Sequence, residues 1–328
     1  MLYSIMSSIE ENIKNQMINT LKETNFPSLG ELYRGKVRDN YIRENQRIII
    51  ATDRLSAFDR VITTIPFKGQ LLNQVSSFWF EKTKNIVRNH IIDVPDPNVA
   101  IVHQCQTLPV EIIVRAYITG TAWRKYLEGE KISGIKLPSG LKKNQLLEEI
   151  LITPSTKAKS GHDIYLSKEQ IINERVVEKG IYEEMEQAAL KLFNFGQKYC
   201  KQNSIIMVDT KYEFGLKDGE LIVIDEIHTQ DSSRFWLLES YEELFEKNEE
   251  PDILDKEIFR EWLMKTYPEI FPNIKPNEPI PPISEDIKIE LAKRYIKSFK
   301  KITRQEFKGE IIDVNHRIYE NLKEANYL

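Results

Sequence analysis

The sequence has few cysteines, and their spacing excludes two classes of protein. Its 2 cysteines, Cys105 and Cys200, form no Cys-x-x-Cys pair and have no histidine-rich spacing around them. A small disulfide-stabilised scaffold needs several paired cysteines, and a structural zinc site needs ligands at short, regular spacings. Both classes are therefore excluded, and we expect two buried thiols in a fold that a hydrophobic core stabilises.

Long apolar runs are also missing. No run approaches the roughly 20 apolar residues of a membrane span. The opening MLYSIMSSIEENIKNQ lacks the basic start, the apolar block and the cleavage site of a secretory leader. We therefore expect a soluble, cytoplasmic protein with no membrane partner.

The sequence has no excess of basic residues. Its 46 Lys and Arg stand against 50 Asp and Glu, which gives a net charge of −4. Binding to nucleic acid needs a basic stripe, so no nucleic-acid partner is expected, and any anionic ligand should be small. A hydrophobic content of 41% in 328 residues supports a core for two lobes. The composition leaves open whether the protein is a monomer or a homo-oligomer.

Acidic side chains gather in residues 205–236, IIMVDTKYEFGLKDGELIVIDEIHTQDSSRFW. Two β-rich runs flank Lys217-Asp218-Gly219, and the Asp-Gly pair favours the tight turn of a hairpin. Side chains on a strand alternate between its two faces, so Asp209, Lys211 and Glu213 are expected on one face.

The second strand of this hairpin ends at Asp225, which would bring a further carboxylate close by. If the strands pair in register, Glu213 and Asp225 converge on Lys211. A magnesium nucleotide site needs hard oxygen ligands for the metal and a cation for the polyphosphate. The alternative is a solvated hairpin face with ordinary charge pairs, and this segment alone does not decide between the two.

A second candidate group lies in residues 31–61. Gly35 is predicted near a turn or bulge, with Lys36 and Arg38 on one face and a buried strand at 47–52. A glycine allows close approach to a phosphate, which two cations can clamp, whereas the alternative is a bulge in a charged surface hairpin. Asp59 follows that strand on a loop, where binding residues often lie.

Arg115 is a single cation in an apolar strand predicted over 108–123. Burying an unpaired guanidinium is costly, so its partner must be either a structural carboxylate or a ligand. The Gly120-Thr121 pair beside it offers backbone and hydroxyl donors. The stretch from Asp231 to Arg234 is interpreted as a turn able to hold a ribose hydroxyl or a phosphate.

The remaining segments are predicted from their composition and periodicity. Residues 134–163 are interpreted as a long functional loop with one short element, in which His162 is either a proton carrier or an ordinary loop histidine. Ser167 and Gln170 predict a capping box for a helix that runs to about Cys200. The proline-rich residues 268–282 predict an extended strap, and Ser284 is expected to cap a last helix.

Several stretches, in one order along the chain, carry a resemblance to a known family. They are LYRGKVRD (32–39), ATDRLSAFD (51–59), PFKGQLLNQVSSFWF (66–80), VEIIVRAYITGTAW (110–123), TPSTKAKSGHD (153–163), VDTKYEFGL (208–216) and IDEIHTQDSSRFW (224–236). Together they resemble SAICAR synthetase, also called phosphoribosylaminoimidazole-succinocarboxamide synthase. The length, the GHD loop and the proline-rich C-terminal portion resemble the longer, yeast-type branch of this family.

The resemblance implies a fold and a reaction. The fold is α+β and two-lobed, with an N-terminal antiparallel sheet lobe like the small lobe of kinases (1–108), an ATP-grasp-like lobe (109–250), and a proline-rich strap with C-terminal helices packed on the second lobe (251–328). The reaction is an ATP-dependent ligation in de novo purine biosynthesis. It joins carboxyaminoimidazole ribonucleotide (CAIR) to L-aspartate and yields SAICAR, ADP and phosphate. Because a carboxylate is a poor electrophile, ATP would first convert it to an acyl phosphate.

Matching motifs imply roles for individual residues. The resemblance implies ATP contacts by Gly35, Lys36, Arg38 and Lys211, adenine contacts by the backbone of the strand segment Leu108 to Glu111, and magnesium ligation by Glu213 and Asp225. It implies contacts to the imidazole ribonucleotide by Arg115, Thr121, Asp231 and Arg234, and contacts to L-aspartate or phosphate by Lys68, Lys157, His162 and Asp163. It further implies Asp59 near the reacting acid group and Asp209 as the proton acceptor. Arg38 replaces the lysine of many relatives, and Thr121 replaces the serine of many short members.

Two other functions remain as alternatives to the ligase. A small-molecule kinase of the inositol-phosphate type would also place a glycine hairpin over ATP and acids on magnesium, although the protein-kinase HRDxxxxN motif is absent. A non-catalytic nucleotide-binding protein could share the fold. The complete set Lys36, Lys211, Glu213, Asp225 and Arg115 argues against the second alternative.

Overall fold

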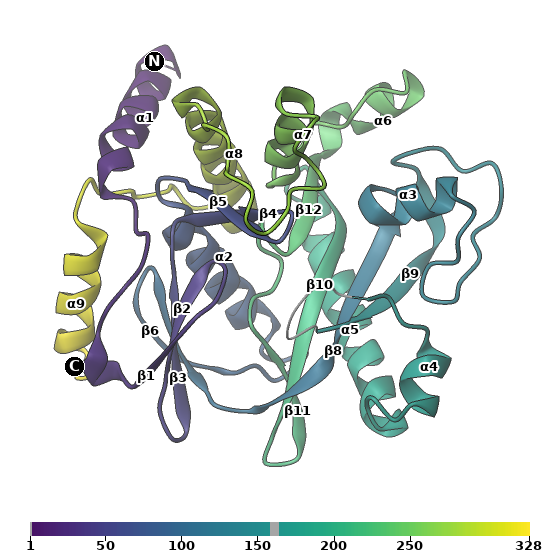
Figure 1. Cartoon of the computed structure of the whole chain (residues 1–328), viewed down its shortest axis with the longest axis horizontal. Coiled ribbons are helices and arrows are strands. Elements are labelled where there is room, and N and C mark those ends of the chain that lie inside the picture. Colours follow the sequence, from purple (N-terminus) through teal and green to yellow (C-terminus); the bar gives the residue numbers. More distant parts are fainter. Residues whose placement is uncertain (1, 158–163) are drawn as a thin grey trace. The chain divides into compact units, whose positions relative to one another are not determined.

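The computed structural model describes residues 2–157 and 164–328 (Figure 1). The chain separates into two compact units. The first unit comprises Met1–Phe78, Ile91–Gln104 and Leu254–Leu328, and the second comprises Trp79–His90 and Cys105–Ile253. This division differs from the three predicted stretches, because the C-terminal helices belong to the first unit.

An antiparallel sheet of five strands forms the centre of the first unit. Its order is β1 (Glu31–Arg34), β2 (Arg38–Ile42), β3 (Gln46–Ala51), β7 (Val99–His103) and β6 (Ile91–Asp96). The predicted buried strand at 47–52 is confirmed as β3. Its side chains alternate, so that Ile48 and Ile50 enter one core cluster and Ile49 enters another with Ala100 and Val102.

The C-terminal helix α9 (Val314–Glu324) completes this core. Val314, Ile318 and Leu322 recur at helical spacing and pack in the same cluster as Ile48 and Tyr41. Burial of this stripe is the physical reason that the end of the chain belongs with the N-terminal sheet.

The other elements of the first unit surround this sheet. They are α1 (Leu2–Gln16), the short helices η1 (Met17–Asn19) and η2 (Pro27–Leu29), the hairpin of β4 (Arg54–Ala57) and β5 (Arg60–Thr64), α2 (Lys68–Thr83, which continues into the second unit), α7 (Glu257–Thr266) and α8 (Glu285–Thr303). The predicted stripe of α8 is confirmed, since Ile287, Leu291, Tyr295 and Phe299 are all buried. Residues 268–282 contain turns and bends without helix or strand, as the prolines predict.

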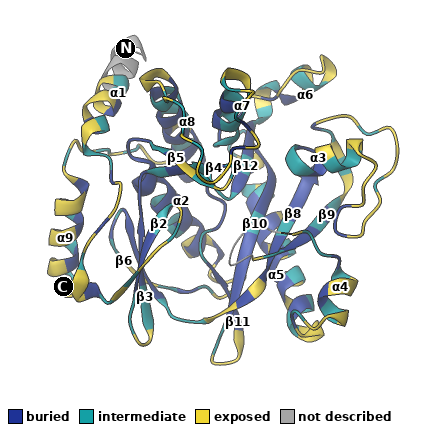
Figure 2. Cartoon of the chain, viewed as in Figure 1, coloured by how far each residue is buried: buried dark blue, intermediate teal, exposed yellow. Residues whose placement is uncertain are grey.

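The sheet of the second unit is organised around one long strand, β10 (Ile205–Lys217). It lies between β11 (Glu220–Ile224) and β8 (Gln106–Tyr117), β9 (Leu146–Thr156) follows β8, and β12 (Ser233–Leu237) also pairs with β10, all antiparallel. The helix α5 (Lys179–Lys201) packs along β10 and β8 (Figure 1). Figure 2 shows that β8 and β10 are buried along most of their length.

Three predictions for the second unit need correction. The strand expected over 108–123 ends at Tyr117, and Gly120, at φ +56°, begins the helix α3 (Gly120–Leu127). The capping box is confirmed, but its helix α4 (Lys168–Asn173) stops before Arg175, whose φ of +53° breaks the path to α5. The stretch 134–163, predicted as a loop with one short element, contains the full strand β9, in which consecutive residues from Leu151 to Thr156 pair with β8. The remaining helix is α6 (Leu238–Glu246).

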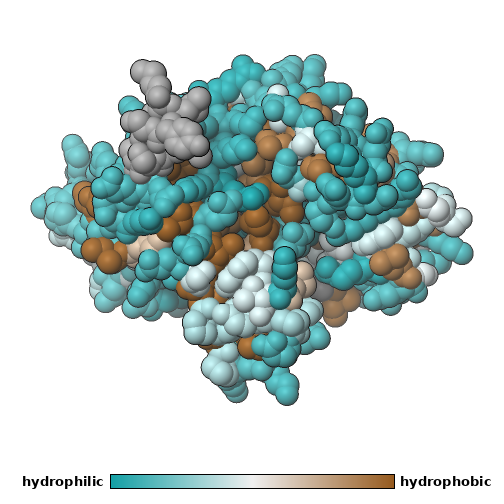
Figure 3. Space-filling view, turned by 90° about the horizontal axis from the view of Figure 1, so that it is seen from above, coloured by the Kyte–Doolittle hydropathy of each residue, from teal (hydrophilic) through white to brown (hydrophobic). Residues whose placement is uncertain are grey.

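The surface is dominated by polar side chains. Figure 3 shows mostly hydrophilic residues on the face that it displays, with apolar residues in smaller groups. None of the helices in the described ranges combines the length and the apolar character that a bilayer span requires.

Candidate active site

The hairpin that the Asp-Gly pair predicts is confirmed. Lys217 pairs with Glu220 and Glu213 pairs with Ile224, so Asp218 and Gly219 form a two-residue turn. Both turn residues have positive φ, +55° and +81°, as the primed turns of hairpins require. Asp225 follows β11 directly, so the register brings it beside the end of the pair that contains Glu213.

A buried cluster of charges surrounds Lys211. Its Nζ donates to Glu111 Oε1 at 2.7 Å and to Glu213 Oε1 at 2.8 Å. Glu111 lies opposite Glu213 in the β8–β10 register, and both carboxylates are buried. Lys157 forms an ion pair with the second oxygen of Glu213. We call these four residues and Asp225 the acidic cluster.

The pKa values within the acidic cluster follow from its charges. Burial would lower the pKa of Lys211, but the negative charges of Glu213, Glu111 and Asp225 raise it well above its ordinary value. Burial would likewise raise the pKa of Glu213, but Lys211 and Lys157 outweigh this effect and hold it well below the ordinary range. Lys211 is therefore a fixed cation and Glu213 a fixed anion at neutral pH. The effect of Asp225 on Lys211 bears out the predicted convergence.

A second charged group, with an excess of positive charge, surrounds Asp209, two residues before Lys211 on β10. Asp209 Oδ2 accepts hydrogen bonds from Arg115 at 2.9 Å and from Arg234 at 2.7 Å. Arg115 also donates to Thr153 Oγ1 and to Tyr165 Oη, each at 3.0 Å. Of the two partners that the sequence allows for Arg115, the structure contains the carboxylate. Two guanidinium groups share one carboxylate here, which leaves one positive charge in excess among these three residues.

The start of α3 lies against Arg234. A side chain at Gly120 would approach the Arg234 guanidinium to 2.5 Å, so a glycine is required for this contact. Thr121, the next residue, accepts a hydrogen bond from Arg124 at 2.8 Å. Asp231 lies in the turn before β12, where its N–H donates to Thr229 Oγ1 at 3.2 Å. A helix N-terminus beside an arginine favours anions, because the free backbone N–H groups and the guanidinium charge both attract negative charge.

The first unit contains the glycine turn. Gly35 N donates to Arg38 O at 2.8 Å and closes the turn between β1 and β2. Lys36 Nζ pairs with Asp59 Oδ1 at 2.5 Å, and both side chains are about half exposed. Arg54 donates to the carbonyls of Gly35 and Lys36 at 3.1 and 3.0 Å, and these hydrogen bonds stabilise the turn.

The remaining predicted site residues are Lys68 and the loop residues His162 and Asp163. Lys68 is the first residue of α2 and is fully buried. Burial raises the pKa of the Asp53 carboxyl to about 6, and the charge of Lys68 is among the influences that oppose this rise. His162 and Asp163 lie outside the described residues. Within the ranges 2–157 and 164–328, no group of three or more His, Cys, Asp or Glu side chains is arranged to hold a metal ion. The predicted metal pair consists of two carboxylates only.

Sequence reasoning missed several contacts in these groups. Tyr165 and Thr153 bind Arg115, but single hydroxyl residues carry no spacing signal. The carboxylate of Glu111 joins the acidic cluster, although the sequence argument considered its backbone alone. Arg54 contacts the glycine turn, and no spacing in the sequence indicates this contact.

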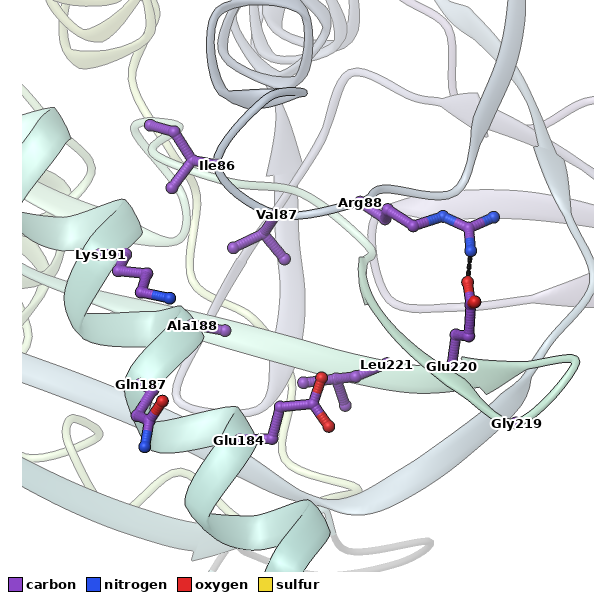
Figure 4. A pocket seen from close by; sticks show the side chains of 10 residues that line it. All are labelled: Ile86, Val87, Arg88, Glu184, Gln187, Ala188, Lys191, Gly219, Glu220 and Leu221. Atoms are coloured by element: carbon purple, nitrogen blue, oxygen red, sulfur yellow. Dashed lines mark ion pairs between the residues drawn. The ribbon is translucent and has the colours of Figure 1, made fainter.

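A separate hollow of about 510 Å³ lies in the second unit. Glu184, Gln187 and Lys191 extend into it from α5, and Arg88 and Glu220 form an ion pair at its edge (Figure 4). Of the predicted site residues in the described ranges, none lines this hollow.

The fold and the charged groups together define a class of protein. In one antiparallel α+β unit, Asp209, Lys211 and Glu213 of β10 meet an arginine pair and further carboxylates from the neighbouring strands, and a glycine turn with a lysine lies in the other unit. This combination fits an enzyme that acts on small phosphorylated molecules.

Comparison with known proteins identifies the family. The model of the family "SAICAR synthetase" matches residues 31–274. The phosphoribosylaminoimidazole-succinocarboxamide synthase of Legionella pneumophila (strain Paris) is 42% identical over 314 residues, which cover 92% of this chain and 97% of the relative. The chain therefore belongs to the SAICAR synthetase family, whose members are ligases of purine biosynthesis.

Solved structures bear out the fold. The SAICAR synthase of Saccharomyces cerevisiae, solved in complex with SAICAR, has a TM-score of 0.75 and 33% identity, and the match covers 88% of this chain and 99% of that one. A type-2 SAICAR synthetase in complex with ADP shares the fold, with a TM-score of 0.65 at 23% identity over 85% of this chain and 100% of that one. The expected α+β fold of this family is thus confirmed.

Proposed function

We propose that this chain joins CAIR and L-aspartate to give SAICAR, with cleavage of ATP to ADP and phosphate. The observation that carries the proposal is the row of buried charges on β10. Asp209, at one end, is paired with two arginines, and Glu213, at the other, belongs to the acidic cluster. One strand therefore offers an anion site and a cation site a few residues apart, as a reaction between a phosphorylated acid and a magnesium nucleotide requires.

Two carboxylates of the acidic cluster are the proposed ligands of a divalent cation, and phosphate oxygens and water would complete its coordination. The three carboxylates of the cluster face Lys211 and Lys157, which leaves one negative charge in excess. The Lys157 ammonium forms an ion pair with Glu213, and the Lys157 side chain is more exposed than that of Glu213. Glu213 and Asp225 would hold magnesium, and the ion when bound would neutralise phosphate charge during phosphoryl transfer.

Each unit contains residues that the family resemblance assigns to the ATP phosphates. Lys211 is a permanent cation within the acidic cluster, and Lys36 is exposed enough to reach a ligand. Gly35 allows close backbone approach, and Arg38 would add a second charge on the glycine turn. The backbone of β8 up to Glu111 would meet adenine.

CAIR would be bound at the arginine pair. Arg115 and Arg234 carry one positive charge beyond that of Asp209, and the start of α3 adds backbone N–H groups. This environment suits a phosphate monoester. The hydroxyl of Thr121 and the carboxylate of Asp231 would bind polar groups of the ribonucleotide.

The chemistry follows from the reactants. A carboxylate is a poor electrophile, so ATP would transfer its γ-phosphoryl group to the CAIR carboxylate, forming an acyl phosphate and releasing ADP. The neutral amine of L-aspartate would then attack the acyl carbon, a C–N bond would form and phosphate would leave. Asp209 would accept the amine proton, Asp59 would lie near the reacting acid group, and Lys68, His162 and Asp163 would bind L-aspartate. The cytoplasm stays the predicted compartment.

Oxygen labelling tests this route. CAIR with ¹⁸O in its carboxylate is incubated with the protein, magnesium ATP and L-aspartate, and the released phosphate is analysed by mass spectrometry. Activation of the carboxylate transfers one ¹⁸O atom to each phosphate. Unlabelled phosphate, with the lost carboxylate oxygen released as water instead, would contradict activation by ATP.

A further inference from the structure

Behind the charged face of β10 lies a buried hydrogen bond between two aromatic side chains. Tyr212 stands between Lys211 and Glu213 in the sequence, so its side chain lies on the opposite face of the strand. Its Oη is 2.5 Å from Nε2 of His228, and both side chains are fully buried.

The surroundings are built to hold the His228 ring. The Trp79 ring meets it edge to face, with centroids 4.7 Å apart. Gly196 of α5 leaves the space that the ring occupies, because a Cβ there would lie 2.7 Å from His228 Cε1. Burial lowers the pKa of His228 to about 3, so the ring is neutral in this apolar site.

His228 belongs to the segment that follows Asp225. We call residues 225–232, which join β11 to β12, the 225–232 turn. Asp225 and His228 both have positive φ, +67° and +52°. Such backbone costs on the order of 1–2 kcal/mol per non-glycine residue and persists only where the surroundings hold it.

Several side-chain hydrogen bonds of this turn stay within it. Thr229 Oγ1 donates to Glu226 Oε2 at 2.6 Å and accepts from the N–H of Asp231 at 3.2 Å. Two bonds join the turn to neighbouring residues of β10. At its far end Lys211 N donates to Ser232 O at 3.1 Å, and nearer to Asp225 the His228 ring bonds the Tyr212 hydroxyl.

We propose that Tyr212 and His228 are positioning residues that fix the 225–232 turn, and with it Asp225, against Lys211 and Glu213. Neither side chain lies on the charged face, so both act through the residues beside them. The catalytic consequence rests on the proposed function of Asp225, whereas the fixing of the turn does not.

The test compares Tyr212→Phe with Tyr241→Phe in the full chain. Tyr241 is a matched control, because its buried hydroxyl also makes one hydrogen bond in the second unit, to Asn144 O at 2.8 Å, away from the acidic cluster. Both variants should lose a similar amount of thermal stability. Tyr212→Phe alone should lower kcat/KM for magnesium ATP by about 10- to 100-fold, since small displacements of reacting groups have such effects.

Hydrogen exchange supplies a readout that needs no activity. Amides of the 225–232 turn should exchange at least about 10-fold faster in Tyr212→Phe than in Tyr241→Phe or the unchanged protein. If the protein proved not to ligate CAIR, the proposed function would fall while this exchange experiment still decided the positioning. Exchange rates and kinetics in Tyr212→Phe that match those of Tyr241→Phe would overturn the proposal.

A second pair of variants tests the proposal even if Tyr212→Phe does not fold. The amide of His228→Gln can still bond the Tyr212 hydroxyl, whereas His228→Leu cannot. We expect His228→Gln to keep kcat/KM for magnesium ATP and turn exchange within about 3-fold of the unchanged protein, and His228→Leu to reproduce the defect. Equal behaviour of the two variants would overturn the proposal.

Discussion

At the scale of single residues, the positions of the charged side chains were partly predictable, whereas most of their partners were not. Lys211, Glu213 and Asp225 converge as the hairpin register requires, and that much follows from strand alternation. The partners Tyr165 and Thr153 of Arg115 could not be predicted, because contacts between distant hydroxyls and a guanidinium leave no periodic trace in a sequence. Arg115 itself was predictable as a buried cation that needs an anion, but not the identity of that anion.

Glu213→Gln tests the acidic cluster directly. The change removes a carboxylate but keeps the shape, so turnover should fall at least about 100-fold, and thermal stability should also fall because the buried Glu213 carboxylate pairs with Lys211 and Lys157. Steady-state ADP release under saturating substrates measures this. Glu220→Gln, an exposed acid on the same hairpin, is the control and should keep its activity. Near-normal turnover in Glu213→Gln would remove this residue from the metal site.

The depressed pKa of Glu213 also predicts a dependence of stability on pH. Its folded pKa lies below the unfolded value of about 4.3, so its stabilising contribution is present above that pH and is lost as the pH falls toward the folded pKa. In urea unfolding below about pH 4, Glu213→Gln should therefore show a slope of unfolding free energy against pH that is smaller by up to about 1.4 kcal/mol per pH unit. Identical slopes in the two proteins would contradict this cause.

Arg115 and Arg234 should differ when each is replaced by alanine. Arg115 is almost fully buried with three side-chain partners, so its loss should cost about 3 kcal/mol or more of unfolding free energy and raise KM for CAIR. Arg234 is more exposed, so its loss should cost less while raising KM for CAIR by about 10-fold. Urea unfolding and initial rates separate the two effects. A fully stable Arg115→Ala protein would show that its ion pair is not structural.

At the scale of elements, local signals predicted the hairpin and α8 but not the breaks. The Asp-Gly turn and the stripe of α8 are local patterns, which the structure confirms. The break at Arg175 could not be predicted, because an arginine at positive φ interrupts a continuous apolar stripe without a glycine or proline. β9 was hidden for a different reason, since the Gly-, Pro- and Lys-rich residues around it outweighed its short alternating run.

Gly219 tests the geometry of the hairpin turn. It has a φ of +81° and open space around its Cα, so Gly219→Ala should destabilise through backbone strain alone, by about 1 kcal/mol. Gly180, in the first turn of α5, lacks positive φ, and Gly180→Ala should stabilise by about 0.5–1 kcal/mol. Urea unfolding measures both. The same sign of change in both variants would refute the turn assignment.

At the scale of the whole molecule, the residues of the proposed reaction come from two compact units. The glycine turn, Asp59 and Lys68 belong to the first, and β10 with its charged partners belongs to the second. The place of the C-terminal helices in the first unit could not be predicted from the sequence. Leu21 and Leu322, from opposite ends of the chain, belong to one core cluster, and such long-range packing has no local signal in the sequence.

The central claim is that this chain uses ATP to join CAIR and L-aspartate. The most direct measurement is ADP release by the purified protein with CAIR and magnesium ATP, with and without L-aspartate, together with mass spectrometry of the product. The account predicts that sustained release requires both co-substrates and that SAICAR forms in equal amount to ADP. Sustained ADP release that is indifferent to L-aspartate, or no release with all substrates present, would contradict it.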